Sequence, residues 1–359
     1  MRSVVTRGTA YFLDAPGAAL APRALTLPER PLAPDQALVE VIACGLCHTD
    51  LGFADGSVKT KHPLPLILGH EVVGTVVEAG ERFPSLVGAP VIVPAVLPCG
   101  HCDFCRAGRG NACPSQQMPG NDIHGGFATH LLVPAAPLVR VDDAPPSFPL
   151  EELSVVADAV STAYQAVRRS CLAAGDAAFV VGAGGVGGFV AQIAAALGAH
   201  VLACDVSPAR LEAAARYGAE TTLDVSAATP HDARKAAHGA ASEWKVPSLR
   251  YRIFECSGTP AGQQLAFGLL ARGATLLQVG YTPKTVDVRL SNLMAFDATV
   301  HGTWGCPPES YPEVLRLVYG GKVALSPFVE RAPMSRLNAL LGDMAQHRLT
   351  RRMILDPTA

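Results

Sequence analysis

Residues 177–205, AAFVVGAGGVGGFVAQIAAALGAHVLACD, decide the fold. The apolar run at 177–181 predicts a buried strand, residues 186–197 predict a helix, and residues 200–204 predict a second strand. Because the stretch has no Asp, Glu, Lys or Arg before Asp205, a membrane span is the competing interpretation. Its six glycines would break such a span, and no cluster of Lys or Arg flanks it.

The glycines between the predicted strand and helix form G-x-G-x-x-G at Gly182, Gly184 and Gly187. In this context they allow a tight turn, a close approach of pyrophosphate and close helix packing, beside the free N–H groups of a helix N-terminus. Asp205 follows Gly187 by 18 residues, where a carboxylate accepts the ribose hydroxyls of adenosine. We predict dinucleotide binding rather than a glycine turn without nucleotide. The predicted cofactor contacts within this half of the chain are Gly182, Gly184, Gly185, Val186, Gly187, Asp205, Arg210 and Val279.

Length and composition indicate an ordinary globular protein of two domains. The chain has 359 residues, 49% hydrophobic and 17% charged, with a net charge of −2. Without a basic excess, neither nucleic acid nor an anionic membrane surface is a predicted partner. The N-terminus lacks the apolar core of a signal peptide, so we expect a cytoplasmic protein. In that compartment ten cysteines favour metal binding or reduced thiols over disulfides.

Two kinds of pattern divide the chain. Residues 1–157 are rich in Pro and Gly and contain short alternating runs, which predict a turn-rich β domain. Residues 158–299 alternate strand and helix patterns, which predict a doubly wound parallel sheet of the Rossmann type and an α/β fold class. The pattern becomes mixed again at 300–359, and we expect this segment to return to the first domain.

The densest chemical cluster holds four cysteines within fifteen residues, Cys99, Cys102, Cys105 and Cys113. Four thiolates fill a tetrahedral shell and leave no open position, as in a structural zinc site. A thiol redox site or an iron–sulfur cluster would use the same sulfurs. The spacing favours structural zinc.

A second group of metal-binding residue types is spread along the chain. Cys47, in the run Cys44-Gly-Leu-Cys-His-Thr-Asp50, the pair His70 and Glu71, and Asp158 together offer thiolate, imidazole and carboxylate. Three such ligands suit Zn²⁺ with a fourth position open for water or substrate. Spacing this wide is equally compatible with buried packing residues.

Taken together, the three constellations resemble the zinc-dependent medium-chain alcohol dehydrogenases over nearly the whole chain. The resemblance implies a β-rich GroES-like catalytic domain beside the Rossmann domain, two zinc ions per chain and NAD. It implies that Cys47, His70 and Asp158 hold a catalytic zinc beside Glu71, and that Thr49 takes the alcohol proton. Cationic contacts to the pyrophosphate are implied for His48 and Arg352.

This sequence departs from the animal liver-type pattern at two positions. Asp158 replaces a cysteine ligand, which makes the predicted metal site harder. Gly52 stands where the liver-type relay has a histidine, which puts the final proton carrier in doubt.

A narrower resemblance rests on residues 116–134, 253–263 and 288–312, QQMPGNDIHGGFATHLLVP, IFECSGTPAGQ and VRLSNLMAFDATVHGTWGCPPESYP. They resemble the 6-hydroxycyclohex-1-ene-1-carbonyl-CoA dehydrogenases of anaerobic benzoyl-CoA degradation. The resemblance implies oxidation of this small-molecule CoA thioester to the 6-oxo product, with hydride transfer to NAD⁺. Family members are commonly homodimers or homotetramers. Zinc-dependent oxidation of another secondary alcohol, zinc-assisted hydration of the enoyl-CoA, and nucleotide binding without catalysis are the alternatives.

Three further expectations concern specificity. A 2′-phosphate beside Asp205 would be repelled by about 4 kcal/mol per unit charge at 4 Å and an effective dielectric of about 20, which favours NAD, although Arg210 could soften this. The loop that carries Asn121, Asp122 and His124 is a candidate border of the substrate site. The cations at 224–252 could contact CoA, but a solvated helix face is favoured; they are Arg234, Lys235, Lys245, Arg250 and Arg252.

Overall fold

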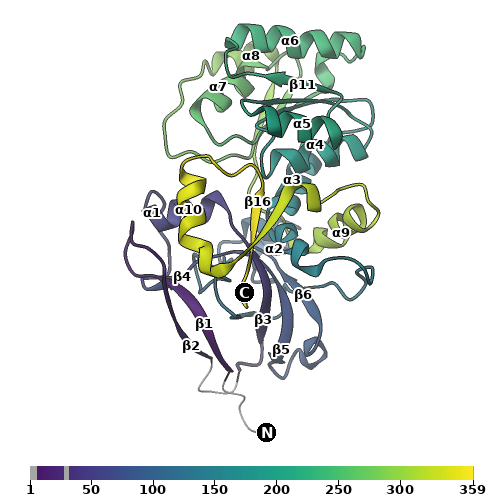
Figure 1. The fold of residues 1–359 in the computed structure, drawn as a ribbon. Helices are drawn as coiled ribbons and strands as arrows, with labels where there is room; N and C mark the ends of the chain where they lie inside the picture. The colour runs from purple at the N-terminus through teal and green to yellow at the C-terminus, as the bar shows by residue number, and fades with distance from the viewer. Residues whose placement is uncertain (1–5, 28–31, 359) are drawn as a thin grey trace. The chain divides into compact units, whose positions relative to one another are not determined.

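The computed structural model describes residues 6–27 and 32–358, which form two compact units (Figure 1). The first unit contains the described residues up to Asp158, together with Gly305–Glu313 and the described residues from Val329 onward. The second contains Ala159–Trp304 and Val314–Phe328. None of the helices in the described ranges is both long enough and apolar enough to cross a membrane.

The first unit is built on β-sheet, as the short alternating runs predict. Its larger sheet has the order β15-β16-β3-β5-β6-β8 with β7 also paired to β3, and its smaller sheet has the order β2-β1-β4. The strands are β1 Thr6–Leu13, β2 Ala21–Leu27, β3 Gln36–Gly45, β4 Leu66–Ile67, β5 Glu71–Ala79, β6 Pro90–Val93, β7 His130–Pro134, β8 Val139–Arg140, β15 Val329–Pro333 and β16 Arg352–Asp356. The helices are α1 His48–Asp55, α2 Asp103–Arg106 and α10 Leu337–Ala345, with 3₁₀ turns that include η2 Gly110–Ala112 and η3 Leu150–Ala157.

Pairing between the two ends of the chain completes the first unit. Strand β16 pairs antiparallel with β3, and Ile354 lies opposite Gly45, which in turn lies opposite Glu71 of β5. A core cluster that includes Phe127, Leu68 and Leu355 fills this unit. The C-terminal part of the chain therefore contributes a strand to the main sheet of the first unit.

The second unit is a parallel sheet of the order β11-β10-β9-β12-β13-β14 within the described residues. This order is that of two mononucleotide-binding halves, and it confirms the predicted Rossmann doubly wound sheet and the α/β class. The strands are β9 Ala177–Val181, β10 His200–Asp205, β11 Thr221–Asp224, β12 Tyr251–Glu255, β13 Thr275–Gln278 and β14 Thr299–Gly302. The helices are α3 Ala159–Arg169, α4 Gly187–Ala196, α5 Pro208–Arg216, α6 Pro230–Glu243, α7 Pro260–Gly268 and α8 Ser291–Phe296; α9 Tyr311–Tyr319 runs across the boundary.

Two boundaries differ from the sequence-based division at residues 157/158 and 299/300. Strand β14 extends the second unit beyond residue 299; it is short and largely exposed, so its apolar pattern is weak. Residues 314–328 also belong to the second unit. There Gln192 of α4 exchanges two hydrogen bonds with the backbone of Ala324, and Phe328 packs against Phe189. These side-chain contacts are non-local, and periodicity alone does not reveal them.

Candidate functional site

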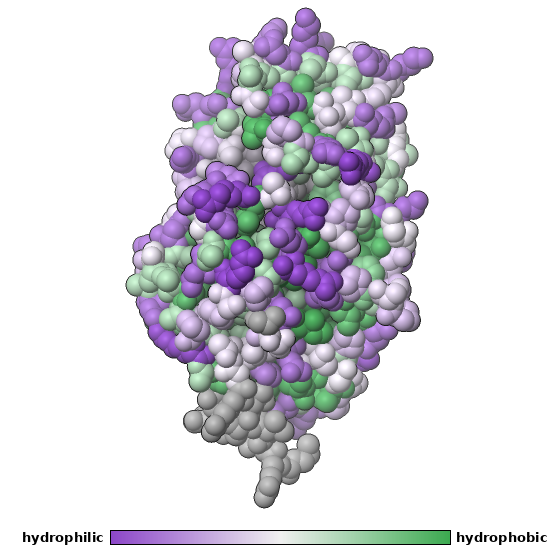
Figure 2. Space-filling model, in the orientation of Figure 1, coloured by the Kyte–Doolittle hydropathy of each residue, from purple (hydrophilic) through white to green (hydrophobic). Residues whose placement is uncertain are grey.

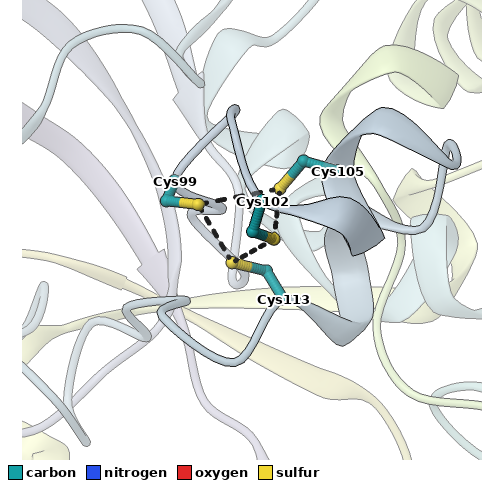
Figure 3. Close-up of side chains that lie close together, drawn as sticks. All are labelled: Cys99, Cys102, Cys105 and Cys113. Atoms are coloured by element: carbon teal, nitrogen blue, oxygen red, sulfur yellow. Dashed lines mark hydrogen bonds between the residues drawn. The ribbon is translucent and has the colours of Figure 1, made fainter.

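The four clustered cysteines come together in one small lobe of the first unit, built on α2 and η2 (Figure 3). Their sulfurs are separated by 3.4 Å (Cys102–Cys105), 3.5 Å (Cys99–Cys113), 3.6 Å (Cys102–Cys113) and 3.9 Å (Cys99–Cys105). Tetrahedral Zn–S bonds of about 2.3 Å would put the sulfurs about 3.8 Å apart. Sulfurs joined in a disulfide are only about 2.05 Å apart. The lobe therefore has the dimensions of a tetrathiolate zinc site.

The ionisation of these thiols also calls for a cation. Hydrogen bonds from the backbone, first of all at His101, lower the pKa of Cys99 to about 6. Desolvation, followed by the hydrogen bond with Cys102, raises the pKa of Cys105 to about 12. Sulfurs this close cannot all become thiolates unless a cation balances their negative charge. A bound zinc ion would supply that positive charge.

The three predicted ligands Cys47, His70 and Asp158 also come together in the first unit, beside Glu71, and one ligand atom of each of the four lies within 4.8 Å of the others. Asp158 Oδ2 lies 3.6 Å from His70 Nε2 and 4.0 Å from Cys47 Sγ. Bonds of usual length to tetrahedral zinc would give about 3.4 and 3.6 Å. His70 Nε2 is buried and has no hydrogen-bond partner among the described residues. The donor set fits zinc after small adjustments.

A neighbouring carboxylate that we did not predict orients these ligands. Asp50 is fully buried, and its Oδ1 lies 3.1 Å from His70 Nδ1 and accepts a hydrogen bond from Gly69 N at 3.1 Å. Its Oδ2 accepts from Cys47 N at 2.9 Å, which makes Asp50 the N3 residue of a capping box on α1. A carboxylate that holds Nδ1 leaves Nε2 available to a metal. The three-residue spacing from Cys47 was the sequence signal for it.

Electrostatics around His70 are dominated by acids. Burial alone lowers the pKa of His70, but Asp50, Asp158 and Cys47 outweigh it and raise this pKa well above its usual value. These neighbouring acidic groups therefore favour a positive charge on the imidazole of His70. A bound zinc ion would supply that charge in place of a proton.

Glu71 and Arg352 form a buried ion pair beside the same ligands. Burial raises the pKa of Glu71 to about 7 against the opposing charge of Arg352, while the pKa of Arg352 is raised by Glu71 despite its burial. Glu71 Oε2 has no hydrogen-bond partner in the described part of the chain, and a Cβ atom on Gly45 would come within 2.2 Å of it. Arg352 therefore contacts Glu71, beside the candidate zinc ligands. Its predicted contact with the pyrophosphate stays a prediction.

The remaining predicted residues of this unit lie on α1. Thr49 is half-buried, with its hydroxyl oxygen 3.7 Å from Cys47 Sγ, so it stands next to the predicted ligands. His48 is exposed. Gly52 faces Val58, whose side chain would lie 3.1 Å from a Cβ atom there, so a larger residue at Gly52 would require a shift of this neighbour.

The glycine turn of the second unit has the predicted geometry. Gly182 has a φ of +90°, and a Cβ atom on Gly187 would lie only 1.8 Å from the carbonyl oxygen of Gly182, so the helix can approach the strand only without a side chain there. Asp205 Oδ2 accepts from Ala183 N at 2.8 Å, and Arg210 lies 3.9 Å from its Oδ1. Asp205 thus fixes the turn, and its predicted ribose contact stays a prediction.

Three other predicted cofactor residues occupy the same edge of the parallel sheet. Gly185 is exposed and Val186 is half-buried at the N-cap of α4, which begins at Gly187. Val279 follows directly after β13, and its N–H donates to the carbonyl of Glu255 at 3.0 Å. The carboxyl edge of a doubly wound sheet is where dinucleotides bind.

Comparison with known proteins identifies the family of both units. Residues 33–143 match the family described as the alcohol dehydrogenase GroES-like domain, and residues 185–319 match the zinc-binding dehydrogenase family. An alcohol dehydrogenase of Geobacillus stearothermophilus is 31% identical over 330 residues, which span 91% of this chain and 93% of that relative. The chain belongs to the zinc-dependent medium-chain alcohol dehydrogenase family.

Solved structures resemble this chain over nearly its full length. The thermostable alcohol dehydrogenase of Pyrobaculum aerophilum, with bound cobalt and zinc, has a TM-score of 0.83 and 27% identity, and the match covers 98% of this chain and 100% of that one. A candidate zinc-binding dehydrogenase of Sinorhizobium meliloti 1021, bound to NADP, has a TM-score of 0.84 and 25% identity with the same coverage. The predicted GroES-like domain and the predicted zinc and nicotinamide cofactors are confirmed at the level of the family.

Proposed function

We propose that this dehydrogenase oxidises the secondary alcohol of 6-hydroxycyclohex-1-ene-1-carbonyl-CoA to the 6-oxo thioester with NAD⁺. The alcohol loses a hydride from its carbinol carbon and a proton from its hydroxyl, which yields the ketone and NADH. The observation that carries a dehydrogenase mechanism is the group Cys47, His70 and Asp158, which offers three zinc ligands of the required types. When bound, zinc supplies Lewis acidity that favours ionisation of an alcohol, and NAD⁺ supplies the hydride acceptor.

Side chains around the metal ligands have separate tasks in this proposal. Asp50 holds His70 in the orientation that presents Nε2. Thr49 carries the nearest hydroxyl on α1 and would accept the alcohol proton. Arg352 keeps a positive charge next to Glu71, which limits the negative charge of the cluster. Each of these groups acts by binding, orienting or moving a proton.

The CoA substrate is supported by the three unusual segments and by where the first one packs. Backbone N–H groups of Gly125, Gly126 and Phe127 donate to the carbonyls of Ile67, Gly69 and Leu68, directly before the ligand His70. The same loop contacts the segment before β4, because Asn121 accepts from Lys61 N and Asp122 pairs with Lys61 Nζ at 2.9 Å. A loop attached to the residues next to His70 is a suitable border for a bulky substrate.

The cations at 224–252 are mostly engaged elsewhere. Arg234 donates to the carbonyl oxygens of Gly268 and Leu270 at the end of α7. Arg250 and Arg252 pair with buried Asp176 at 2.7 and 3.4 Å. These three arginines cap a helix and neutralise a buried acid, so we do not assign them to the CoA phosphates.

Another group of cations is better suited to phosphate. On the face shown in Figure 2, hydrophilic residues gather around α10 and β16. A cavity of about 220 Å³ there is lined by Arg336, Arg348 and Arg351 as well as by Glu330 and Asp343. Since Arg348 pairs with Asp343, we propose Arg336 and Arg351 as the cations for CoA. Replacing each with Ala should raise KM for the thioester and leave KM for NAD⁺ unchanged.

The decisive assay follows NADH absorbance with NAD⁺ and the cyclic hydroxyenoyl-CoA, beside a count of zinc per chain. Faster turnover of the free alcohol than of the thioester would favour the second candidate, a general zinc alcohol dehydrogenase. Consumption of the thioester without formation of NADH would instead indicate hydration. Wild-type activity of a Cys47→Ala variant would contradict the metal-based mechanism.

We also propose that the protein forms a homodimer through the edge of its parallel sheet. Strand β14 is the terminal strand, and apolar side chains near it are exposed, among them Leu290 (67%), Met294 (78%) and Trp304 (53%). Exposed apolar side chains at an open strand edge are characteristic of an interface. Light scattering should give twice the chain mass, and Met294→Lys should shift this mass toward the monomer.

A further inference from the structure

Glu255, the last residue of β12, is a fully buried carboxylate for which the catalytic proposal has no use. Its Oε1 accepts hydrogen bonds from Ser257 N at 2.8 Å, Ser257 Oγ at 2.5 Å and Gly258 N at 3.2 Å. Its Oε2 accepts from Gln278 Nε2 at 2.8 Å. A carboxylate, which only accepts, matches four donors, three from the loop after β12 and one from the end of β13. The arrangement is too well satisfied to be an accidental burial of charge.

These hydrogen bonds tie together the loops that follow β12 and β13. Gln278 Nε2 also donates to the carbonyl of Gly280 at 2.7 Å. The N–H groups of Val279 and Gly280 both donate to the backbone carbonyl of Glu255, at 3.0 and 2.9 Å. The two loops touch so closely that a Cβ atom on Gly280 would lie 2.3 Å from Gly258 N. Glu255 therefore determines where the backbone at 257–258 and at 279–280 lies.

This ledge, defined as residues 257–258 and 279–280, occupies the coenzyme edge of the sheet. The order β11-β10-β9-β12-β13-β14 reverses between β9 and β12, and dinucleotides cross such a sheet at the point of reversal. The half with β9, the glycine turn and Asp205 is the adenosine half. The half with β12 and β13 is consequently left for the nicotinamide end. The ledge also abuts the glycine turn, since a Cβ atom on Gly182 would lie 2.7 Å from Ser257 N.

We propose that Glu255 is a positioning residue for the nicotinamide half of the coenzyme. Its carboxylate holds both parts of the ledge in the conformation that accepts the nicotinamide and its ribose. The inference depends on the family's use of a nicotinamide dinucleotide and is independent of the CoA substrate. A purely structural carboxylate would stabilise the sheet without distinguishing one half of the coenzyme from the other.

The test uses Glu255→Gln and two ligands, NADH and AMP. Glutamine keeps the size of the side chain but turns an NH₂ group toward either Gln278 Nε2 or the N–H groups of the first loop, so that donor faces donor. We expect the Kd for NADH, measured by its fluorescence, to rise at least tenfold. The Kd for AMP, measured by calorimetry, should stay within twofold of wild type, because AMP occupies only the adenosine half.

Asp176→Asn is the matched control. Asp176 is as deeply buried in the same unit, accepts from Ala173 N and pairs with Arg250, but it directly precedes β9 at the opposite edge of the sheet. This variant removes the same charge and should leave both Kd values unchanged while it lowers Tm. If Glu255→Gln fails to fold, Gln278→Met removes one donor from Glu255 and the bond to Gly280 and should still weaken NADH selectively.

Unchanged NADH affinity in a folded variant of Glu255 or Gln278 would overturn the proposal. An equal loss of NADH and AMP affinity would also overturn it, because the carboxylate would then support the unit as a whole. Both measurements need no alcohol substrate. Failure of the proposed CoA thioester activity therefore leaves this test unaffected.

Discussion

Asp50→Asn tests whether a buried carboxylate next to α1 sets the metal affinity of the catalytic site. Asp50 uses both oxygens, one for His70 Nδ1 and Gly69 N and the other for Cys47 N. Asparagine has one acceptor and one donor. With its oxygen toward His70, its NH₂ group faces Cys47 N–H. With the amide reversed, the NH₂ group donates to Nδ1, which forces the proton onto Nε2 and prevents metal binding there.

The magnitude follows from the bonds lost. A hydrogen bond to a charged group contributes about 1.5–3 kcal/mol, and 1.4 kcal/mol is a factor of ten in affinity. Zinc can bind only with the amide oxygen toward His70, an orientation that loses the bond to Cys47 N, so zinc affinity at the catalytic site should fall about 10- to 100-fold, the usual cost of removing such a partner. Turnover at limiting zinc should fall in parallel.

The assay is metal counting by mass spectrometry after dialysis against a graded series of chelator. Wild-type protein should lose zinc in two steps, and in Asp50→Asn only the step of the catalytic site should move to weaker chelation. The cysteine lobe is the internal control, because Asp50 contacts none of Cys99, Cys102, Cys105 and Cys113. An unchanged pair of steps, or a shift of both steps together, would refute the reasoning.

Three further outcomes follow from the same geometry. The Cys105→Ser variant should lose one zinc per chain and have a Tm several degrees lower, because three thiolates no longer close the tetrahedral shell. A metal count that still finds two zinc ions per chain would contradict this. The Asp205→Ala variant should have a KM for NAD⁺ about tenfold higher or more and a weaker preference for NAD⁺ over NADP⁺. The substitution removes both the predicted ribose acceptor and the bond to Ala183 N. An unchanged KM for NAD⁺ would count against the assignment. His124 has a pKa below the usual value of 6.5, first because its ring is desolvated and then because His62 is adjacent. The folded protein disfavours the protonated imidazole of His124, so stability should fall as pH drops below about 6.5. The His124→Gln variant should therefore have a Tm that is less sensitive to pH between about 7.5 and 5.5. Equal slopes of Tm against pH in the variant and the wild type would disprove this.

Features that depend on neighbouring residues were predictable from the sequence. The strand, glycine turn and helix at Ala177–Ala196 lie where periodicity and the glycine spacing put them, because the constraints act within one βα unit. The lobe of Cys99 to Cys113 is equally local, since fifteen residues of chain bring four sulfurs within reach of one ion. The parallel order of the sheet followed from the alternation of strands and helices.

The tertiary structure decided what depends on residues far apart in the chain. Glu71 and Arg352 are separated by 281 positions and meet only because β3 pairs with both β5 and β16. Asp50 and His70 are 20 positions apart, and no period of helix or strand links them. Residues 314–328 join the second unit through contacts of single side chains such as Phe328. Sequence pattern therefore determined the fold and the types of ligand. Long-range strand pairing decided which polar groups share a buried site, because a buried polar group is stable only next to a partner, and here that partner lies far away in the chain.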